Sequence, residues 1–137
     1  STAIDNRTNL DLDHLVSGKI KLGASPTASK TVQVYAYAAQ SIASGTPAYP
    51  DSITGTDANK TMTSANVAYA CLRRLWQATT DAATGLVLQM PPTSIAQAFG
   101  YVPPFWGLFV VHDSGVALDS TDSNHSMQYH RIQAQSV

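Results

Sequence analysis

The chain has 137 residues, a length typical of one domain with its own hydrophobic core, and its only cysteine, Cys71, rules out an internal disulfide framework. Eight Lys and Arg stand against nine Asp, Glu is absent, and the net charge of −1 gives no electrostatic basis for binding nucleic acid. No apolar run reaches the roughly 18 residues of a membrane span, and no signal-peptide pattern opens the sequence. We therefore expect a protein without nucleic-acid or membrane partners.

Residues 1–13 are polar and lack periodicity, which predicts an extended N-terminal arm or edge segment ahead of a single domain over residues 14–137. Near the start of that domain, Val16, Ile20 and Leu22 alternate with polar residues. A period of two is typical of a half-buried strand.

Residues 31–39 repeat the alternation and predict a second strand. Its outer face carries Tyr35 and Tyr37, whose rings would offer flat, amphipathic contact area. Residues 40–61 are rich in Pro, Gly, Ser, Thr and Asp and predict one long loop. Loops of this length are commonly functional or disordered.

The segment 64–80 fits either a helix or a short helical turn that is followed by a strand from about Leu72. We favour the turn and strand, because residues 81–90 look like a hairpin loop and its return strand.

Residues 94–99 predict a short helix, with Ser94 as its N-cap and Gly100 as its end. Residues 105–111 are apolar at every position, as in a central strand covered on both faces. The sequence HDSG that follows is typical of a turn.

Residues 116–118 and 127–134 predict two closing strands on either side of a polar loop. Seven or eight short strands and one short helix near 94–99 predict an all-β protein, an antiparallel β-sandwich. A jelly roll is the favoured form. An immunoglobulin-like sandwich stays open as the alternative, because the sequence does not fix the order of the strands.

His112, Asp113 and Ser114 supply the three residue types of a hydrolase triad in one tripeptide. Neighbouring side chains on a strand point to opposite faces, whereas a Ser–His–Asp relay needs the histidine between its two partners. We therefore interpret the tripeptide as a strand end and a turn, and we expect a protein that is not an enzyme.

Elsewhere the sequence predicts no catalytic, cofactor-binding or metal-binding set. Cys71 in an apolar context is typical of a small buried side chain. Asp11 and Asp13 of the segment DLDH could hold a hard cation, but without a third ligand a solvated N-terminal segment is the simpler interpretation. His125 and His130 would face opposite ways on a strand.

The run SIAQAFGYVPPFWGLFVVHDSGVAL (94–118), with LVSGKIKLG (15–23) and NHSMQYHRI (124–132), resembles small structural proteins of tailed bacteriophages. It is most similar to the jelly-roll cement, or head-decoration, proteins of podophages, that of a Bordetella phage among them. The resemblance is strongest over residues 94–118 and moderate at both termini. The loop 40–61 has no part in it.

This resemblance implies a dimeric jelly roll that is made in the host bacterial cytoplasm and sits on the outer surface of the virion. There it would bind the major capsid protein and cement neighbouring subunits. Low charge and a polar arm agree with that role. On grounds of expected exposure, we predict capsid contacts from six residues: Ile4, Arg7, Leu10, Tyr35, Tyr37 and Tyr49.

The alternative function is that of a carbohydrate-binding jelly-roll module of a phage tail or fibre. It would use Trp76 or Tyr49 as a platform on which sugars stack. Trp76 is flanked by Arg74 and Gln77 and could belong to the core or to the surface. Trp106, within the apolar run, is expected in the core.

Overall fold

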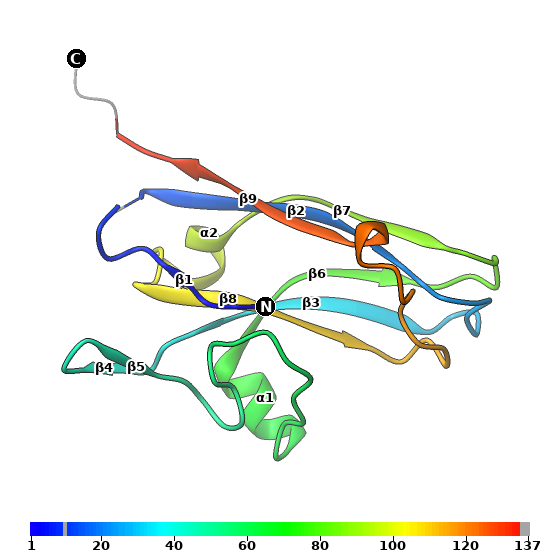
Figure 1. Cartoon of the computed structure of the whole chain (residues 1–137), viewed down its shortest axis with the longest axis horizontal. Helices are drawn as coiled ribbons and strands as arrows, with labels where there is room; N and C mark the ends of the chain where they lie inside the picture. The colour runs from blue at the N-terminus through cyan, green and yellow to red at the C-terminus, as the bar shows by residue number, and fades with distance from the viewer. Residues whose placement is uncertain (10, 135–137) are drawn as a thin grey trace.

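Two antiparallel sheets face each other in the computed structural model, which describes residues 1–9 and 11–134 (Figure 1). Their strands are β1 (Ile4–Asp5), β2 (Asp13–Lys21), β3 (Thr31–Ala38), β6 (Leu72–Thr79), β7 (Val87–Ser94), β8 (Phe105–His112) and β9 (Ser126–Ile132). The first sheet has the order β1–β8–β3–β6, and the second has the order β7–β2–β9. The all-β sandwich predicted from the sequence is confirmed.

The strand order has features of both predicted forms. The nested pairs β2–β9 and β3–β8 join early strands to late ones, as in a jelly roll, and the pair β2–β7 corresponds to strands B and E of an immunoglobulin-like sandwich. Among the described long strands, only the connection from β3 to β6 stays within one sheet.

The expected hairpin over residues 81–90 is wrong, because β6 and β7 belong to different sheets. β7 pairs instead with β2, where Leu88 lies opposite Ile20 and Met90 lies opposite Gly18. Packed sheets are about 10 Å apart, a distance that the seven-residue connection 80–86 spans as easily as it would close a hairpin. A hairpin within one sheet and a crossing between two sheets therefore give the same sequence pattern.

The main core fills the space between the two sheets. It is built from aliphatic side chains of both sheets, together with Trp106, which is fully buried as predicted. The predicted helix is present as α2 (Ile95–Phe99): the Ser94 hydroxyl accepts from the Gln97 amide, and Gly100 ends the helix with φ of 81°. Because Ile95 is buried in the core, α2 fixes the end of the sandwich that lies beside β2 and β6.

A second, smaller core covers the outer face of the first sheet. The chain between β3 and β6 forms a hairpin, β4 (Ser41–Ala43) and β5 (Thr46–Ala48), then an irregular segment and α1 (Ala65–Cys71). The expected helical turn and strand from Leu72 is thus confirmed, whereas the single long loop is interrupted by a hairpin. Figure 1 shows this excursion on the far side of the first sheet from the main core.

The excursion buries the two tyrosines that the sequence placed on an exposed face. Tyr35 is 9% exposed and Tyr37 is 2% exposed, and both pack with Ile53 and Leu72. The prediction of an exposed tyrosine row is therefore wrong. An amphipathic ring at an outward position suits a solvent-facing surface and a second packed layer equally, so the alternation in β3 could not distinguish them.

The start of the chain takes the edge-segment form of the prediction and not that of a free arm, and the strand expected after β8 is shorter. Ile4 pairs with Trp106, so the start of the chain is an edge strand of the first sheet. The expected strand 116–118 is reduced to one bridge, from Leu22 to Leu118. The turn after β8 is confirmed, with Gly115 at φ of 75°.

Candidate interaction surface

The tripeptide at the end of β8 forms no catalytic relay. The Ser114 side chain is fully buried, and its hydroxyl donates to the Val116 carbonyl at 2.9 Å. His112 Nδ1 lies 3.0 Å from the Ser114 hydroxyl oxygen. Asp113 points away and pairs with Lys30 at 3.1 Å. A hydroxyl whose proton is bonded to the backbone and whose surroundings are closed to solvent is a turn-stabilising group.

Asp11 and His14 of the DLDH segment are buried, so the expectation of a solvated segment is wrong for these two residues. One oxygen of Asp11, Oδ2, accepts hydrogen bonds from His14 Nε2 and from Arg131 Nε, both at 2.7 Å. The other, Oδ1, accepts from Arg131 at 3.1 Å and from Gln133 at 2.7 Å. Arg131 foremost, with His14 and Gln133, holds the pKa of Asp11 well below its usual range against the opposing effect of burial.

His14 is held on both ring nitrogens. The indole N–H of Trp106 can only donate, and it donates to His14 Nδ1 at 2.8 Å, so Nε2 carries the proton that His14 donates to Asp11. Only 1% of the side chains of His14 and Asp11 is exposed. With no free nitrogen and no access to solvent, the pair ties β2 to β8 and β9 and has no room for acid–base chemistry.

Asp13, the other candidate ligand, holds α2. It accepts from the Ser94 hydroxyl at 2.6 Å and from the Ala96 amide at 2.9 Å. Within residues 1–9 and 11–134, no group of three or more His, Cys, Asp or Glu side chains is placed to hold a metal ion.

Of the predicted contact residues that the structure describes, only Arg7 is exposed. Its guanidinium forms an ion pair with Asp5 at 2.8 Å and lies 4.5 Å from the centre of the Phe105 ring. Ile4 packs partly against the main core. Leu10 lies outside the described residues.

Neither aromatic platform of the alternative function stands free. Tyr49 is half-buried, with its ring edge-on to Tyr37 at 5.6 Å between centroids. Trp76 is also half-buried and packs against the main core.

The edges of the two sheets, which the sequence alone does not locate, differ sharply. β7 carries Pro91 and Pro92, and β6 carries the exposed Arg73 and Arg74, features that discourage the addition of another strand. β1 has two residues. β9 has seven residues and no proline, and its one charged side chain, Arg131, is already bonded to Asp11.

Exposed apolar side chains accompany the β9 edge. Within the described chain, seven large apolar residues are exposed, and three of them belong to β9 or lie just before β2: Leu12 at 60%, Tyr129 at 41% and Ile132 at 41%. The Leu12 amide donates to the Ile132 carbonyl at 2.8 Å, which places these two residues side by side. Tyr129 and Ile132 are three residues apart on β9 and so point to opposite faces of the sheet. Exposed apolar residues along an open sheet edge mark a surface that a partner can cover.

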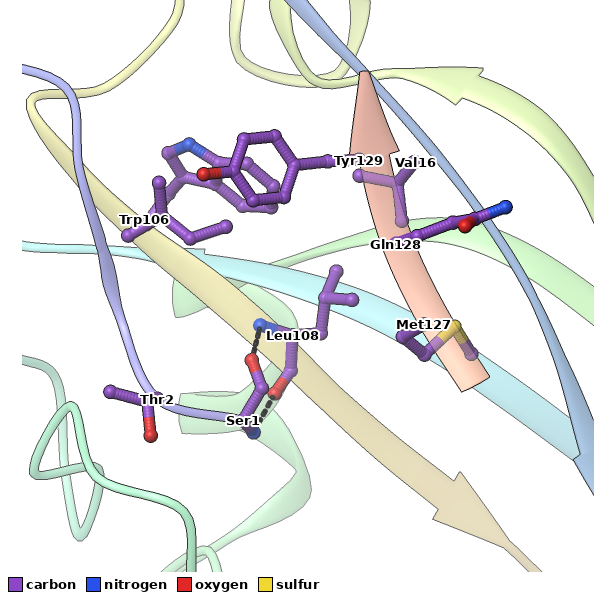
Figure 2. Close-up of a pocket in the computed structure, with 9 residues that line it drawn as sticks. Ser1, Thr2, Val16, Trp106, Leu108, Met127, Gln128 and Tyr129 are labelled. Atoms are coloured by element: carbon purple, nitrogen blue, oxygen red, sulfur yellow. Dashed lines mark hydrogen bonds between the residues drawn. The ribbon is translucent and has the colours of Figure 1, made fainter. Parts of the chain in front are cut away.

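A pocket of about 250 Å³ opens next to this edge, between β9 of one sheet and β1 and β8 of the other (Figure 2). Its apolar lining is Ile4, Val16, Trp106, Leu108, Met127 and Tyr129. Ser1, Thr2 and Gln128 complete it, so that the one charged group of the described lining residues is the N-terminal ammonium of Ser1. Figure 2 shows the Ser1 backbone and hydroxyl bonded to Leu108, which fixes the N-terminal wall.

Comparisons of the chain with protein-family models, with curated proteins and with solved structures find no match. In the part of the chain that the structure describes, none of the helices has the length and apolar character needed to span a membrane.

Proposed function

We propose that this chain is a non-enzymatic structural protein that binds the outer surface of a phage capsid and cements neighbouring major capsid subunits. The observation that carries the proposal is the open β9 edge, with its exposed apolar residues and the pocket beside it. An edge strand without proline or free charge is a site for pairing with another chain, and a partner that covers it removes the risk of aggregation. The resemblance in residues 94–118 supplies the kind of partner.

Such a protein would act by burying surface across the joints between capsid subunits. A contact of standard size, about 1,600 Å², need not bind tightly in isolation. A copy that touches two subunits gains through effective concentration, and a homodimer would double the number of contacts. Since the chain has few charged residues, we expect its binding to depend only weakly on salt.

The carbohydrate-binding alternative is less well supported. Stacking on a sugar needs an aromatic face that is open to solvent. Trp76 and Tyr49 are both packed against other side chains of the chain.

The test is to mix the purified protein with phage heads that lack decoration, and to measure co-sedimentation and image the product. We expect saturable binding at regular positions on the shell and a rise in the temperature at which heads release their DNA. Retention on a glycan array, together with no binding to heads, would reject the proposal in favour of the alternative.

A further inference from the structure

We propose that the excursion between β3 and β6, residues 39–71, is a cover that opens as one unit and exposes a preformed aromatic surface of the first sheet. The aromatic surface consists of Tyr35 and Tyr37 of β3 and Phe109 of β8, which the closed excursion keeps out of reach. The inference goes beyond the proposed function, and its tests need only the purified chain.

The two ends of the excursion lie side by side. β3 and β6 are neighbouring antiparallel strands, and Tyr37 of β3 lies opposite Leu72 of β6. The excursion is therefore a long loop that leaves the first sheet and re-enters it at adjacent positions, and it lies across the outer face of that sheet (Figure 1). It can move as a whole about its two ends while the strands of the two large sheets keep their neighbours.

Few side chains hold the excursion against the sheet. Among the excursion residues whose side chains the structure describes, only Pro50 and Ile53 are buried. Tyr49 and Met62 are partly buried against the smaller core. A segment with so few buried apolar contacts belongs to the low-stability end of a protein, where local opening costs less free energy than global unfolding.

Polar contacts between the excursion and the sandwich are also few. Away from the ends of the excursion, three contacts between described groups join the two: the Ala3 amide with the Gly55 carbonyl at 2.8 Å, Arg7 with the Gly45 carbonyl at 3.4 Å, and the Ser1 ammonium with Asp57 at 3.8 Å. Because Arg7, Gly45 and Asp57 are exposed, water can replace the second and third contacts at little cost.

The excursion carries hydrogen bonds of its own. β4 pairs with β5, the Ser52 hydroxyl donates to the Thr61 carbonyl at 2.8 Å, and the Thr63 amide donates to the Asp51 carboxylate at 2.6 Å. Each of these bonds joins two residues of the excursion, so none of them is broken by opening. We therefore expect the segment to open as a unit and not residue by residue.

The tyrosines underneath do not depend on the excursion for their hydroxyl partners. Tyr35 donates to Gln33 Oε1 at 2.9 Å, and Tyr37 donates to the Ser1 carbonyl at 2.7 Å. The Tyr37 ring also fills the space over Gly107 of β8, where even a Cβ atom would collide with it. Opening thus leaves both hydroxyls paired and both rings in place, which makes the aromatic surface preformed.

Native-state hydrogen exchange tests whether the excursion opens as a unit. We expect the bonded amides of Gln40, Ile53 and Thr63 to be protected at least about tenfold less than the amides of β3 and β8, and to share one dependence on denaturant. Protection equal to that of β3 and β8 would overturn the proposal, and so would a different denaturant dependence for each amide.

Two matched substitutions separate local opening from global unfolding. Ile20 is buried in the main core and Ile53 in the smaller core, whereas Ile42 of β4 is exposed. Ile20→Val should lower the protection of β8 about fivefold and leave that of the excursion unchanged, because the main core stays intact when the excursion opens. Ile53→Val should lower both about fivefold, since its contacts are lost in the open and in the unfolded state, and Ile42→Val should change neither. An excursion whose protection falls with Ile20→Val, or does not fall with Ile53→Val, would overturn the proposal.

Nitration of tyrosine rings by tetranitromethane tests whether opening exposes the aromatic surface. Ile53→Val should speed the nitration of Tyr37 about fivefold, Ile20→Val should leave it unchanged, and Tyr101, which is 57% exposed, should react alike in all the variants. An equal rise for Ile20→Val would show that Tyr37 is reached only when the sandwich unfolds, and would overturn the proposal.

Discussion

Asp11 and His14 carry the same functional groups as Asp113 and His112, yet the first pair links buried strands whereas the second lies at an exposed turn. The first pair is buried, hydrogen-bonded to each other and to Trp106 and Arg131, and joins three strands. The second pair lies at an exposed turn, where the histidine and the aspartate bond to different partners. Both stretches look like candidate sites in the sequence, and neither is built for chemistry.

The difference comes from residues that are distant along the chain. Arg131 reaches Asp11 from 120 residues away, and Trp106 reaches His14 from 92 residues away, because β9 and β8 pass beside β2. At the turn, Ser114 takes the histidine contact locally and Lys30 takes the aspartate at the surface. Burial and long-range pairing therefore decide what a polar cluster does.

Asp11→Asn should lower the stability of the fold more than any other substitution in this comparison. In either orientation, the amide nitrogen of Asn would face two donors, either Arg131 and Gln133 or Arg131 and His14. Removing one partner of a buried charge pair is strongly destabilising, so we expect the melting temperature to fall by about 10 °C. The matched control is Asp113→Asn, for which thermal melting should show almost no change, because its ion pair is exposed. Equal shifts for the two variants would contradict the distinction.

Lowering the pH should show the contribution of the Asp11 carboxylate to the melting temperature. The pKa of Asp11 is lowered in the folded protein, so its carboxylate stabilises the fold above the pKa of the unfolded chain, about 4, and that stabilisation is lost as the pH falls further. Between about pH 7 and pH 3, the melting temperature of the original chain should therefore fall more than that of Asp11→Asn. Asp119, whose pKa is also lowered, contributes equally to both proteins and cancels in the difference.

Local patterns in the sequence were enough to predict much of the fold. The alternation in β2 and β3, the Ser94 cap and Gly100 end of α2, and the turn at Gly115 each depend on residues close together in the chain. These features need no knowledge of which segments meet in space.

The order of the strands, the burial of Tyr35 and Tyr37 and the interaction surface could not be predicted in the same way. Each depends on which distant segments come together: the excursion after β3 covers the tyrosines, and the neighbours of β9 leave one of its sides open. Of the six predicted contact residues, Ile4 lines the pocket, although the sequence predicts its contact from an exposed arm and not from a pocket.

Ser114→Ala tests the turn and should have the smallest of these effects. The substitution removes the hydroxyl that donates to Val116 and lies within 3.0 Å of His112 Nδ1, while the methyl group fits the same buried space. Losing one neutral hydrogen bond costs about 1 kcal/mol, and chemical denaturation should measure that loss against Ser123→Ala, a change at an exposed position. Binding to heads should stay as it is, since the Ser114 side chain is fully buried and belongs to neither β9 nor its pocket. A loss of head binding at unchanged stability would show that the turn after β8, and not only the β9 edge, belongs to the interaction surface.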